Sequence, residues 1–348
     1  MWAIPTMLGI ILIVLALLHA APGDPATQML GLGGGGSGEV SQEGADIEAK
    51  IAKFKHEKGL DRNFFIQYLG FLGPFNTKPD GHELFGGDGR HPYAGLLTLD
   101  FGTELFDTNK SIGEEIRKRL KEVTLPMALI STLIIYLLAL PIGIYSANRQ
   151  GTRIDKATTL TLFILYSIPV FWAGLMLQLG FGKTGLGILP VLGMHSRGAE
   201  DLSTTAYIAD VLKHFFLPVA TMSYGGLAYL SRQMRSGMIE VIHQDYIRTA
   251  RAKGLGERAI IFKHALRNSV IPVITIFASI LPIMIGGSLI IEVVFDLPGM
   301  GMYMYKGLLS RDYNVIMATM TLSGAMTLMG ILLSDIAYAI VDPRISYS

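Results

Sequence analysis

The sequence predicts an all-α integral membrane protein with about six transmembrane helices and a periplasmic insertion between the first and the second. Two observations predict this fold class. The 348 residues are 50% hydrophobic and only 16% charged, with a mean hydropathy of +0.43, whereas soluble domains carry about 25% charged residues. In addition, several apolar runs are long enough to cross a hydrocarbon core of about 30 Å as helices of about 20 residues.

The apolar runs span roughly residues 2–21, 125–146, 157–181, 214–231, 270–291 and 315–341. The fourth run is the least apolar, and Pro218 and Gly225-Gly226 interrupt it. Membrane helices tolerate proline because neighbouring helices satisfy the carbonyls that it frees. The first run is interpreted as a retained span and not as a cleaved signal sequence, since no Lys or Arg precedes it and Pro22 directly follows Ala20-Ala21.

Basic residues in the short loops predict the orientation. The loop after the second run holds Arg149, Arg153 and Lys156. The loop after the fourth run holds many more cations than anions, namely Arg232, Arg235, Arg248, Arg251, Lys253, Arg258, Lys263 and Arg267 against Glu240, Asp245 and Glu257. Both loops, and with them both termini, are therefore expected in the cytoplasm. The basic run 117–121 then lies outside, which is acceptable because long translocated segments largely escape this rule.

The chain is expected to divide into a first transmembrane helix at 1–21, an extracytoplasmic insertion at 22–124 and a transmembrane core at 125–348. In the insertion, Ile47, Ile51 and Phe54 recur at helical spacing and predict a helix up to Lys58-Gly59. An amphipathic stretch follows over 61–75, and residues 111–122 are expected to form a helix that leads into the membrane. The glycine run 31–38 contains G-x-G-x-x-G, but no strand precedes it, so it is interpreted as a flexible linker. We expect the insertion to form a small cap on the spans.

Motifs for catalysis and cofactor binding are missing. The chain has no cysteine, and none of its histidines forms a zinc-type pair. Leu177 stands where a phosphate-binding loop ending in Gly182-Lys183-Thr184 would need glycine, and neither H-E-x-x-H nor G-x-S-x-G occurs. A net charge of +1 gives no support for nucleic-acid binding. We therefore expect a chain that is not an enzyme and binds no metal or cofactor itself.

The most informative segment is the basic stretch 243–255 in the second of these loops. One face of a helix here carries apolar and small residues, namely Tyr246, Ile247, Ala250, Gly254 and Leu255, while Arg248, Arg251 and Lys253 project elsewhere. Small residues four apart let another surface approach the backbone closely. From the residues alone, two interpretations stay open: a docking helix for a soluble partner, or an amphipathic helix on the inner leaflet with Gly254 as its C-terminal cap.

The run Tyr246-Ile-Arg-Thr-Ala-Arg-Ala-Lys-Gly-Leu255, followed by Lys263-His-Ala-Leu-Arg-Asn-Ser-Val-Ile-Pro272, resembles the cytoplasmic signature of ABC import permeases of the dipeptide/oligopeptide branch. Motifs elsewhere resemble other parts of that family in the same order: Ala21-Pro-Gly-Asp-Pro25, Gly59-Leu-Asp-Arg62 with Gln67-Tyr68, Leu297-Pro-Gly-Met-Gly301, Ser310-Arg-Asp-Tyr313 and Val341-Asp-Pro-Arg-Ile345. The chain resembles the B-type of the two paired permeases. It departs from the general importer signature in having Arg248-Thr249-Ala250 where Glu-Ala-Ala is usual, and it lacks the family's basic N-terminal stretch before the first span.

The resemblance implies a multi-pass subunit of the bacterial cytoplasmic (inner) membrane that imports short peptides by alternating access. Its implied partners are a second, C-type permease, two ABC ATPase subunits that use the ATP, an extracytoplasmic peptide-binding protein and the lipid bilayer. A coupling helix near 244–255 would dock on an ATPase through Tyr246, Arg248, Thr249, Ala250, Arg251 and Gly254. The same machinery could carry a nickel chelate, glutathione or a sugar. Alternatives of another class are an ion-driven secondary transporter and a membrane scaffold, although the spans show no mid-membrane charged pair.

Other residues are candidates because of their place in the membrane. Asp335, near the inner end of the sixth run, is expected to pair with a cytoplasmic Arg, with a role in the substrate path as the alternative. Gly286 and Gly287 would either permit close helix packing or line the path. Glu292, Arg311 and Asp312 lie toward the outer side, where contact with a binding protein is the expected role.

Overall fold

The computed structural model describes residues 3–29, 42–73, 95–270, 273, 276 and 288–341. Within these ranges the chain is built of helices, and its only extended pairing is two isolated bridges, Gly95 with Asp100 and Thr103 with Ser111. The predicted all-α class is thus confirmed. Contacts divide the chain into two compact units, Met1–Glu122 with Met300–Met326 and Val123–Gly299 with Thr327–Ser348. The first unit joins the first span and the insertion to residues that the sequence analysis had assigned to the core.

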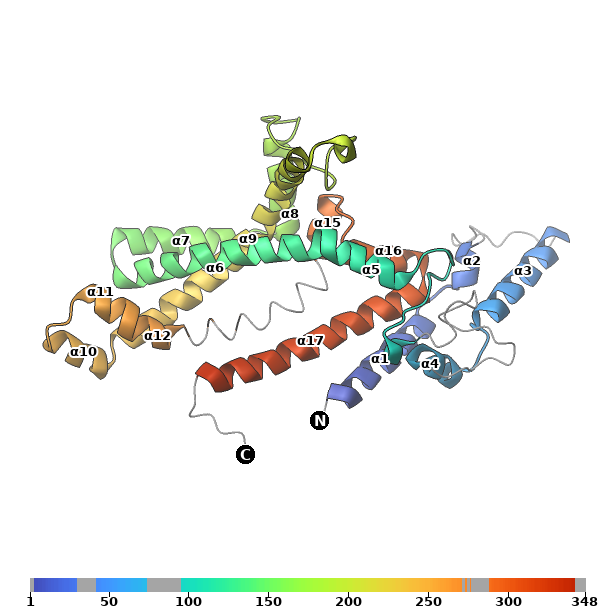
Figure 1. Cartoon of the computed structure of the whole chain (residues 1–348), viewed down its shortest axis with the longest axis horizontal. Helices are drawn as coiled ribbons and strands as arrows, with labels where there is room; N and C mark the ends of the chain where they lie inside the picture. Colours follow the sequence, from blue (N-terminus) through green and yellow to red (C-terminus); the bar gives the residue numbers. More distant parts are fainter. Residues whose placement is uncertain are drawn as a thin grey trace. The chain divides into compact units, whose positions relative to one another are not determined.

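Three helical stretches among the described residues are long and apolar enough to cross a membrane: Ala3–Ala20 (α1), Ile112–Asn148 and Tyr313–Leu333. They correspond to the first, second and sixth predicted spans. The second stretch joins α5 (Ile112–Arg119) to α6 (Leu125–Asn148) through a π-helical turn, Leu120–Thr124. The helix predicted over 111–122 therefore runs directly into the span. The last stretch begins α17 (Tyr313–Val341), as Figure 1 shows.

The third predicted span is broken in the middle. Its two parts, α7 (Arg153–Ser167) and α8 (Val170–Phe181), meet at an angle of 98°. Pro169 has no N–H to donate and disfavours a helical conformation in the residue before it, and Ile168 is accordingly extended, with φ −79° and ψ 125°. The carbonyl of Ile168 accepts a hydrogen bond of 2.6 Å from the Tyr224 hydroxyl. This run is therefore a pair of apolar helices that meet at a sharp bend, and not one straight helix.

The fourth predicted span lies inside a much longer helix. α9 (Thr204–Ile242) contains 39 residues, includes Pro218 without ending there, and continues into the stretch expected to be a loop after residue 231. Because it is mixed in polarity, it is not among the described helices that meet the criteria for a span. Most of the fifth predicted span lies outside the described residues, and the described part includes the start of α15 (Leu289–Val294).

The first unit is a small bundle around α1. Buried side chains of α1, α4 (Phe64–Leu72), α5 and α17 meet in one cluster that includes Leu15, Phe71, Ile112 and Met317. Short helices α2 (Pro25–Met29) and α16 (Met300–Ser310) belong to the same unit, as does α3 (Gln42–Lys58). The helices α3 and α4 correspond to the first two of the three helices predicted in the insertion. Gly59, at φ +64°, ends α3 in a conformation that favours glycine.

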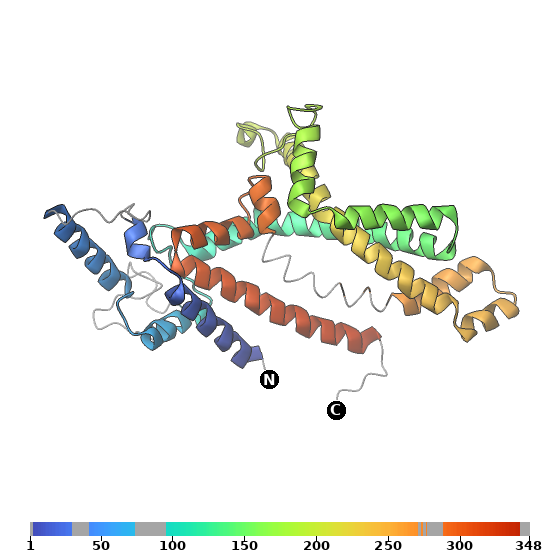
Figure 2. The ribbon, with the colours of Figure 1, turned by 180° about the vertical axis from the view of Figure 1, so that it is seen from behind.

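In the second unit, α6 and α7 lie alongside the second half of α9, in both views of the ribbon (Figures 1 and 2). Gly143 of α6 makes close approach possible, because a Cβ there would come within 2.6 Å of Met234 Cβ on α9. After α9 the chain turns back through α10 (Asp245–Ala252), α11 (Glu257–Ala259), a π-helical segment (Ile260–Ala265) and α12 (Leu266–Ser269). These short elements cover the end of α9.

Candidate functional site

The predicted docking segment forms α10, an eight-residue helix at the end of the second unit. Gln244 is extended before it, Asp245 lies in its first turn, and Arg251 lies in its last turn, as the helix dipole favours. Gly254, at φ +78°, closes the helix in the left-handed conformation. Its N–H bonds the Arg251 carbonyl at 2.9 Å, and the N–H of Leu255 bonds the Ala250 carbonyl at 3.3 Å. This is a Schellman cap, so Gly254 does hold the C-terminal position that one of the two interpretations gave it.

The buried face of α10 is narrow. Ile247 is fully buried and Ala250 is 8% exposed, both in a cluster with Met238 of α9 and Ile260. Ala250 therefore packs inward. Of the two small residues that were expected to form a flat outer face, only Gly254 lies at the surface. The physical reason is spacing, since Ile247 and Ala250 are three residues apart and share the inward face. Tyr246 and Leu255, which were placed on that same face, are each 42% exposed.

The outward face of α10 is polar and partly held in place by its own contacts. Arg251 bonds both carboxylate oxygens of Glu257, at 2.9 and 3.4 Å. The Tyr246 hydroxyl accepts a hydrogen bond of 2.8 Å from Asn268. The remaining predicted docking residues, Arg248 and Thr249, are exposed on the same helix. An exposed cationic surface of this kind suits a protein partner with an acidic rim.

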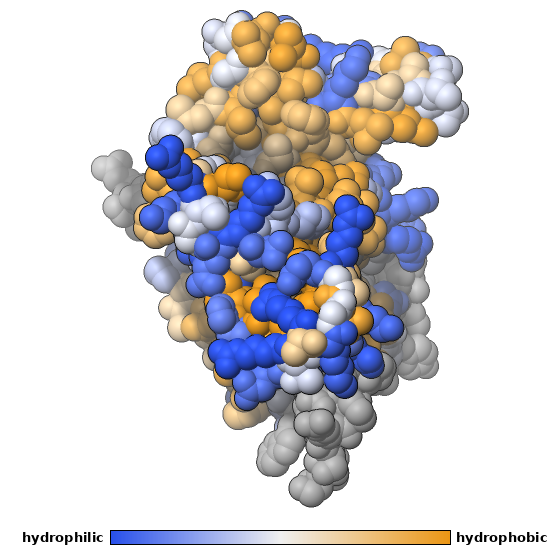
Figure 3. All heavy atoms as spheres, turned by 90° about the vertical axis from the view of Figure 1, so that its left-hand side faces the viewer, coloured by the Kyte–Doolittle hydropathy of each residue, from blue (hydrophilic) through white to orange (hydrophobic). Residues whose placement is uncertain are grey.

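Hydrophilic side chains also dominate the surroundings of α10. Figure 3 looks onto the end of the second unit that carries α10 and α11, and it shows hydrophilic side chains (blue) gathered there with hydrophobic atoms (orange) visible between them. The exposed residues on and after α10 include the cations Arg248, Arg251, Lys253 and Arg258. This end is therefore distinct in character from the apolar helices behind it.

A buried ion pair lies close to this end, between α7 and α9. The carboxylate of Asp155 is 3% exposed and accepts hydrogen bonds from Arg235 Nε at 2.7 Å and Arg235 Nη2 at 2.9 Å. The Ser146 hydroxyl donates to it at 2.6 Å and the Gly151 N–H at 2.9 Å. Hydrogen bonding to Arg235, helped by these donors, holds the pKa of Asp155 well below its usual range. The α6–α7 turn is thus tied to the part of α9 that leads to α10.

Sequence reasoning counted Arg235 as a loop cation and did not single out Asp155. A local signal was present, because Thr152 precedes Asp155 by three residues, the spacing of a helix start with a capping side chain. In the structure Thr152 Oγ1 indeed accepts a hydrogen bond of 3.3 Å from the Asp155 N–H. The partner, however, is 80 residues away, and no local pattern indicates it.

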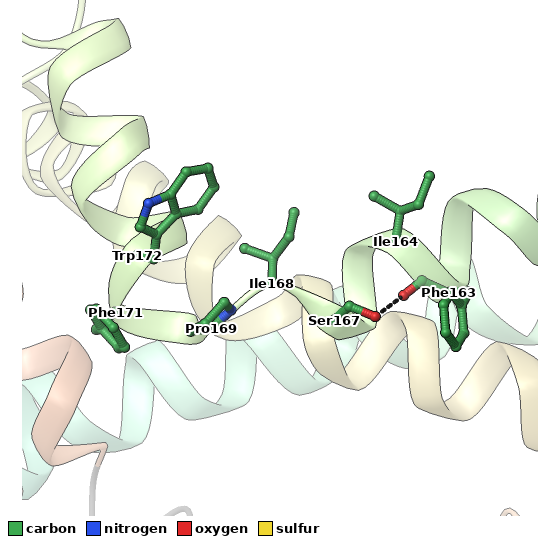
Figure 4. Close-up of a pocket in the computed structure, with 7 residues that line it drawn as sticks. All are labelled: Phe163, Ile164, Ser167, Ile168, Pro169, Phe171 and Trp172. Carbon is green, nitrogen blue, oxygen red and sulfur yellow. Dashed lines mark hydrogen bonds between the residues drawn. The ribbon is translucent and has the colours of Figure 1, made fainter.

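The bend between α7 and α8 carries an apolar groove of about 470 Å³. Figure 4 shows how its lining side chains fan out on both sides of Pro169, with the Ser167 hydroxyl bonded back to the Phe163 carbonyl at 2.9 Å. Phe163, Phe171 and Trp172 are all about half exposed. No lining side chain is charged, so this surface suits lipid or apolar protein contact rather than solute binding.

The residues expected to meet a binding protein at the outer side are used inside the first unit. Asp312 is 3% exposed, and its carboxylate accepts hydrogen bonds from the amides of Leu105 at 2.8 Å and Val315 at 3.0 Å. Burial raises the pKa of Asp312 to about 6, against the opposing effect of these amides. Arg311, half-buried and at φ +56°, donates to the Pro22 carbonyl. Asp312 therefore has no side-chain surface for a partner in this conformation.

Glu292 of α15 is likewise fully buried, in the second unit. The Thr124 hydroxyl donates to its carboxylate at 3.4 Å. A Cβ at Gly299 would come within 2.4 Å of the same carboxylate, so a side chain at this position would require the carboxylate to shift. The prediction that Glu292 contacts a binding protein is therefore wrong for this structure, because its carboxylate faces the protein interior.

The remaining candidates give no site geometry. Gly286 and Gly287 lie outside the described residues. Asp335 lies on α17, where the structure describes the backbone but not that side chain. Within the described ranges, no three His, Asp or Glu side chains come together as a metal site would require.

Apolar helices of membrane length, a sharply bent pair of apolar helices and a polar helical end together define a multi-pass helical membrane protein. Residues 139–347 match the family described as binding-protein-dependent transport system inner membrane component, and the chain belongs to that family. The match covers more than half of the sequence and includes α10, α9 and the Asp155–Arg235 pair.

The likeness to individual relatives extends over both units. The chain is 38% identical over 345 residues to the oligopeptide transport system permease protein AppB of Bacillus subtilis (strain 168), covering 99% of this chain and 96% of the relative. It is 31% identical over 357 residues to the dipeptide transport system permease protein DppB of Alkalihalophilus pseudofirmus, with the same coverage. The corresponding DppB of Escherichia coli (strain K12) is 29% identical over 360 residues, again with 99% and 96% covered.

Proposed function

We propose that this chain is the B-type permease subunit of an ATP-driven importer of short peptides in the bacterial inner membrane. The observation that carries the proposal is the full-length similarity to an oligopeptide permease, which includes the insertion as well as the family region. Similarity to dipeptide permeases over the same length points to the same substrate class. Transport of a nickel chelate, glutathione or a sugar by the same machinery is the alternative, and the names of these relatives favour peptides.

In the proposed mechanism, α10 is the coupling helix that receives movement from an ATPase subunit. Its exposed residues Arg248, Thr249 and Gly254 would contact the ATPase, while Ile247 anchors the helix in the cluster with Met238 of α9. Because close-packed side chains transmit displacement with little compression, a push on α10 would reach α9 directly. The Asp155–Arg235 pair would then carry the movement to α7 and to the α6–α7 turn.

The proposed complex contains this chain, a C-type permease, two ABC ATPases and an extracytoplasmic peptide-binding protein. ATP would be bound and hydrolysed by the ATPase subunits, and the permeases would alternate between outward-open and inward-open states. The basic loops that hold Arg149 and Arg248 would face the cytoplasm together with both termini, in line with the positive-inside rule.

The proposal is tested with the complete complex in proteoliposomes. Labelled di-, tri- and tetrapeptides should accumulate only when the binding protein is present on the extracytoplasmic side and hydrolysable ATP on the side of the ATPase subunits. A complex whose ATPase subunits cannot hydrolyse ATP is the matched control. Uptake that needs an ion gradient and no ATPase would instead establish a secondary transporter. A complex that hydrolyses ATP in response to a loaded sugar-binding or chelate-binding protein, and never to a peptide-loaded one, would move the assignment to the alternative solutes.

A further inference from the structure

A second cavity of the chain lies inside the second unit, among helices expected to cross the membrane. It has a volume of about 500 Å³, within the range of small-molecule sites. Its walls come from α6, the start of α8, α9, and residues at 276, 288 and 291. Apolar side chains such as Ile135, Met222 and Leu230 alternate with hydroxyl-bearing ones, which are Ser131, Thr132, Tyr136, Thr221, Tyr229 and Ser288.

The polar groups in this cavity are uncharged, and one of them is unsatisfied. Ser131 is 1% exposed, and its hydroxyl has no hydrogen-bond partner among the residues that the structure describes. Its oxygen is closed off from the cavity, so in this conformation it is not a group that a ligand reaches. By contrast, the Thr221 hydroxyl already donates to the Leu217 carbonyl at 2.8 Å and retains capacity to accept.

Two adjacent glycines of α9 contribute to the cavity in different ways. A Cβ at Gly226 would come within 2.6 Å of Ile135 Cδ1, so this glycine allows α9 to approach α6. A Cβ at Gly225 would meet no atom within 4 Å. Close packing explains the first glycine but not the second. The consequence of glycine at 225 is open space in the cavity.

We infer that this cavity is a transit site for the uncharged part of the transported solute, and that Gly225 sets the bulk of side chain that it accepts. The inference rests on the proposed function, because it takes the solute to be a peptide. Main-chain amides of a peptide offer both donors and acceptors to the other hydroxyl-bearing side chains of the lining, such as Thr132 and Thr221, whereas a lipid acyl chain offers neither. The lack of charge in the lining also suits transit, since a solute held by ion pairs would leave slowly.

The first test compares side-chain bulk at the cavity with the same change elsewhere. In the complete complex, Gly225→Leu should lower uptake of trileucine at least about tenfold relative to wild type while leaving triglycine within about twofold. Gly180→Leu is the matched control, because Gly180 also lies in a helix of this unit, has no atom within 4 Å of its Cβ position, and does not line the cavity. Gly225→Ala should give an intermediate loss for trileucine.

The second test identifies the occupant directly. The chain has no cysteine of its own, so Thr132→Cys places a single thiol in the cavity wall. Trileucine with the binding protein should slow modification of this thiol by a small maleimide in the assembled complex, and triglycine should do so less. Modification that peptide does not slow, but that only membrane-soluble reagents achieve, would assign the cavity to lipid. If the thiol reacts in the isolated chain but is blocked in the assembled complex even without peptide, the cavity is filled by the second permease.

The outcomes separate the cavity from the function of the whole protein. Suppose that the wild type takes up both peptides. If Gly225→Leu then loses uptake of trileucine and triglycine equally, or loses none, the inference is overturned and the proposed function stands. If wild type takes up no peptide under any condition, the proposed function fails, and the inference with it. Membrane level and assembly of each variant are measured first, and Gly225→Ala supplies the answer if Gly225→Leu does not assemble.

Discussion

Arg235 and Asp155 form a two-point ion pair, with Nε–Oδ1 at 2.7 Å and Nη2–Oδ2 at 2.9 Å, that joins α9 to the first turn of α7. The carboxylate side chain is 5% exposed and the arginine side chain 26% exposed. Removing one member of a buried pair leaves the other uncompensated, which is why such pairs are more consequential than surface ones. This pair is therefore a polar contact that holds the α6–α7 turn against the part of α9 that leads to α10.

We expect Asp155→Ala to lower the free energy of unfolding by about 2 to 3 kcal/mol, less than for a wholly buried pair because Arg235 is partly exposed. The measurement is a double-mutant cycle with Arg235→Ala in detergent. The stability losses of the two single variants should sum to clearly more than the stability loss of the double variant. The matched control is the surface pair Arg248–Asp245, at 3.5 Å with side chains 71% and 95% exposed, whose coupling should stay below about 1 kcal/mol. Strictly additive losses at Asp155 and Arg235 would contradict the role given to this pair.

The two buried aspartates should respond to pH in opposite ways. The folded pKa of Asp155 is depressed, so its stabilisation is complete above the unfolded pKa of about 3.9 and is lost only as pH falls below it. The folded pKa of Asp312 is raised to about 6, so the folded state binds more protons than the unfolded state between about pH 4 and 6. Stability contributed through Asp312 therefore increases as pH falls from 7 toward 4.

For Asp312 the expected gain between pH 7 and pH 4.5 is about 1 to 3 kcal/mol in the free energy of unfolding. It is measured as the difference in thermal unfolding between wild type and Asp312→Asn at both pH values, because the variant removes the titration of this one side chain. The difference between the two proteins should shift in favour of wild type at the lower pH. An unchanged difference across this range would show that Asp312 does not titrate there.

Helix periodicity in the sequence predicted much of the first unit. The spacing of Ile47, Ile51 and Phe54 correctly indicated α3, and the helix expected over 111–122 is present as the one that leads into α6. These predictions succeed because each depends on residues within a few turns of one another. Long-range partners are not encoded in this way, so the bonds from Asp312 to the amide of Leu105 and from Arg235 to Asp155 were not predictable from local pattern.

Proline shows the limit of local rules most clearly. Pro169 breaks the third predicted span, while Pro218 sits within α9 and does not end it. The difference lies in tertiary contact, since Tyr224 of α9 satisfies the carbonyl exposed at the break. In α10, the hydrophobic pattern placed Ile247 on one face with Tyr246 and Ala250, the face expected to meet a partner or the inner leaflet, whereas the structure buries Ile247 in the core. The pattern did not separate Ala250, which is buried, from Tyr246, which is 42% exposed.

The orientation can be tested with single thiols, because the chain has no cysteine. Lys253→Cys, just after α10, and Lys118→Cys, on α5, both occupy exposed positions. In right-side-out membrane vesicles an impermeant maleimide should label Lys118→Cys and leave Lys253→Cys unlabelled until the membrane is permeabilised. Each variant serves as the other's control. Labelling of Lys253→Cys in intact vesicles would place α10 outside and remove it from the reach of an ATPase.

Gly254 offers a test of the proposed coupling helix. Its φ of +78° is unfavourable for other residues by about 1 to 2 kcal/mol, yet a Cβ there would meet no atom within 4 Å. Gly254→Leu should therefore insert and fold normally, and its bulk would act on a docked partner. In the complete complex we expect ATP hydrolysis to continue while peptide uptake falls at least about tenfold, because an altered fit on a docking surface is worth about 1.4 kcal/mol or more.

Two further variants separate contact from backbone strain at this position. Gly254→Asn keeps the left-handed conformation that asparagine tolerates and adds a smaller side chain, so it should retain more uptake than Gly254→Leu. Gly256→Leu adds the same bulk two residues away, also with no atom within 4 Å of its Cβ and without a positive φ, and should preserve more coupling than Gly254→Leu. Equal ratios of uptake to ATP hydrolysis in wild type and Gly254→Leu would show that no ATPase approaches this end of α10.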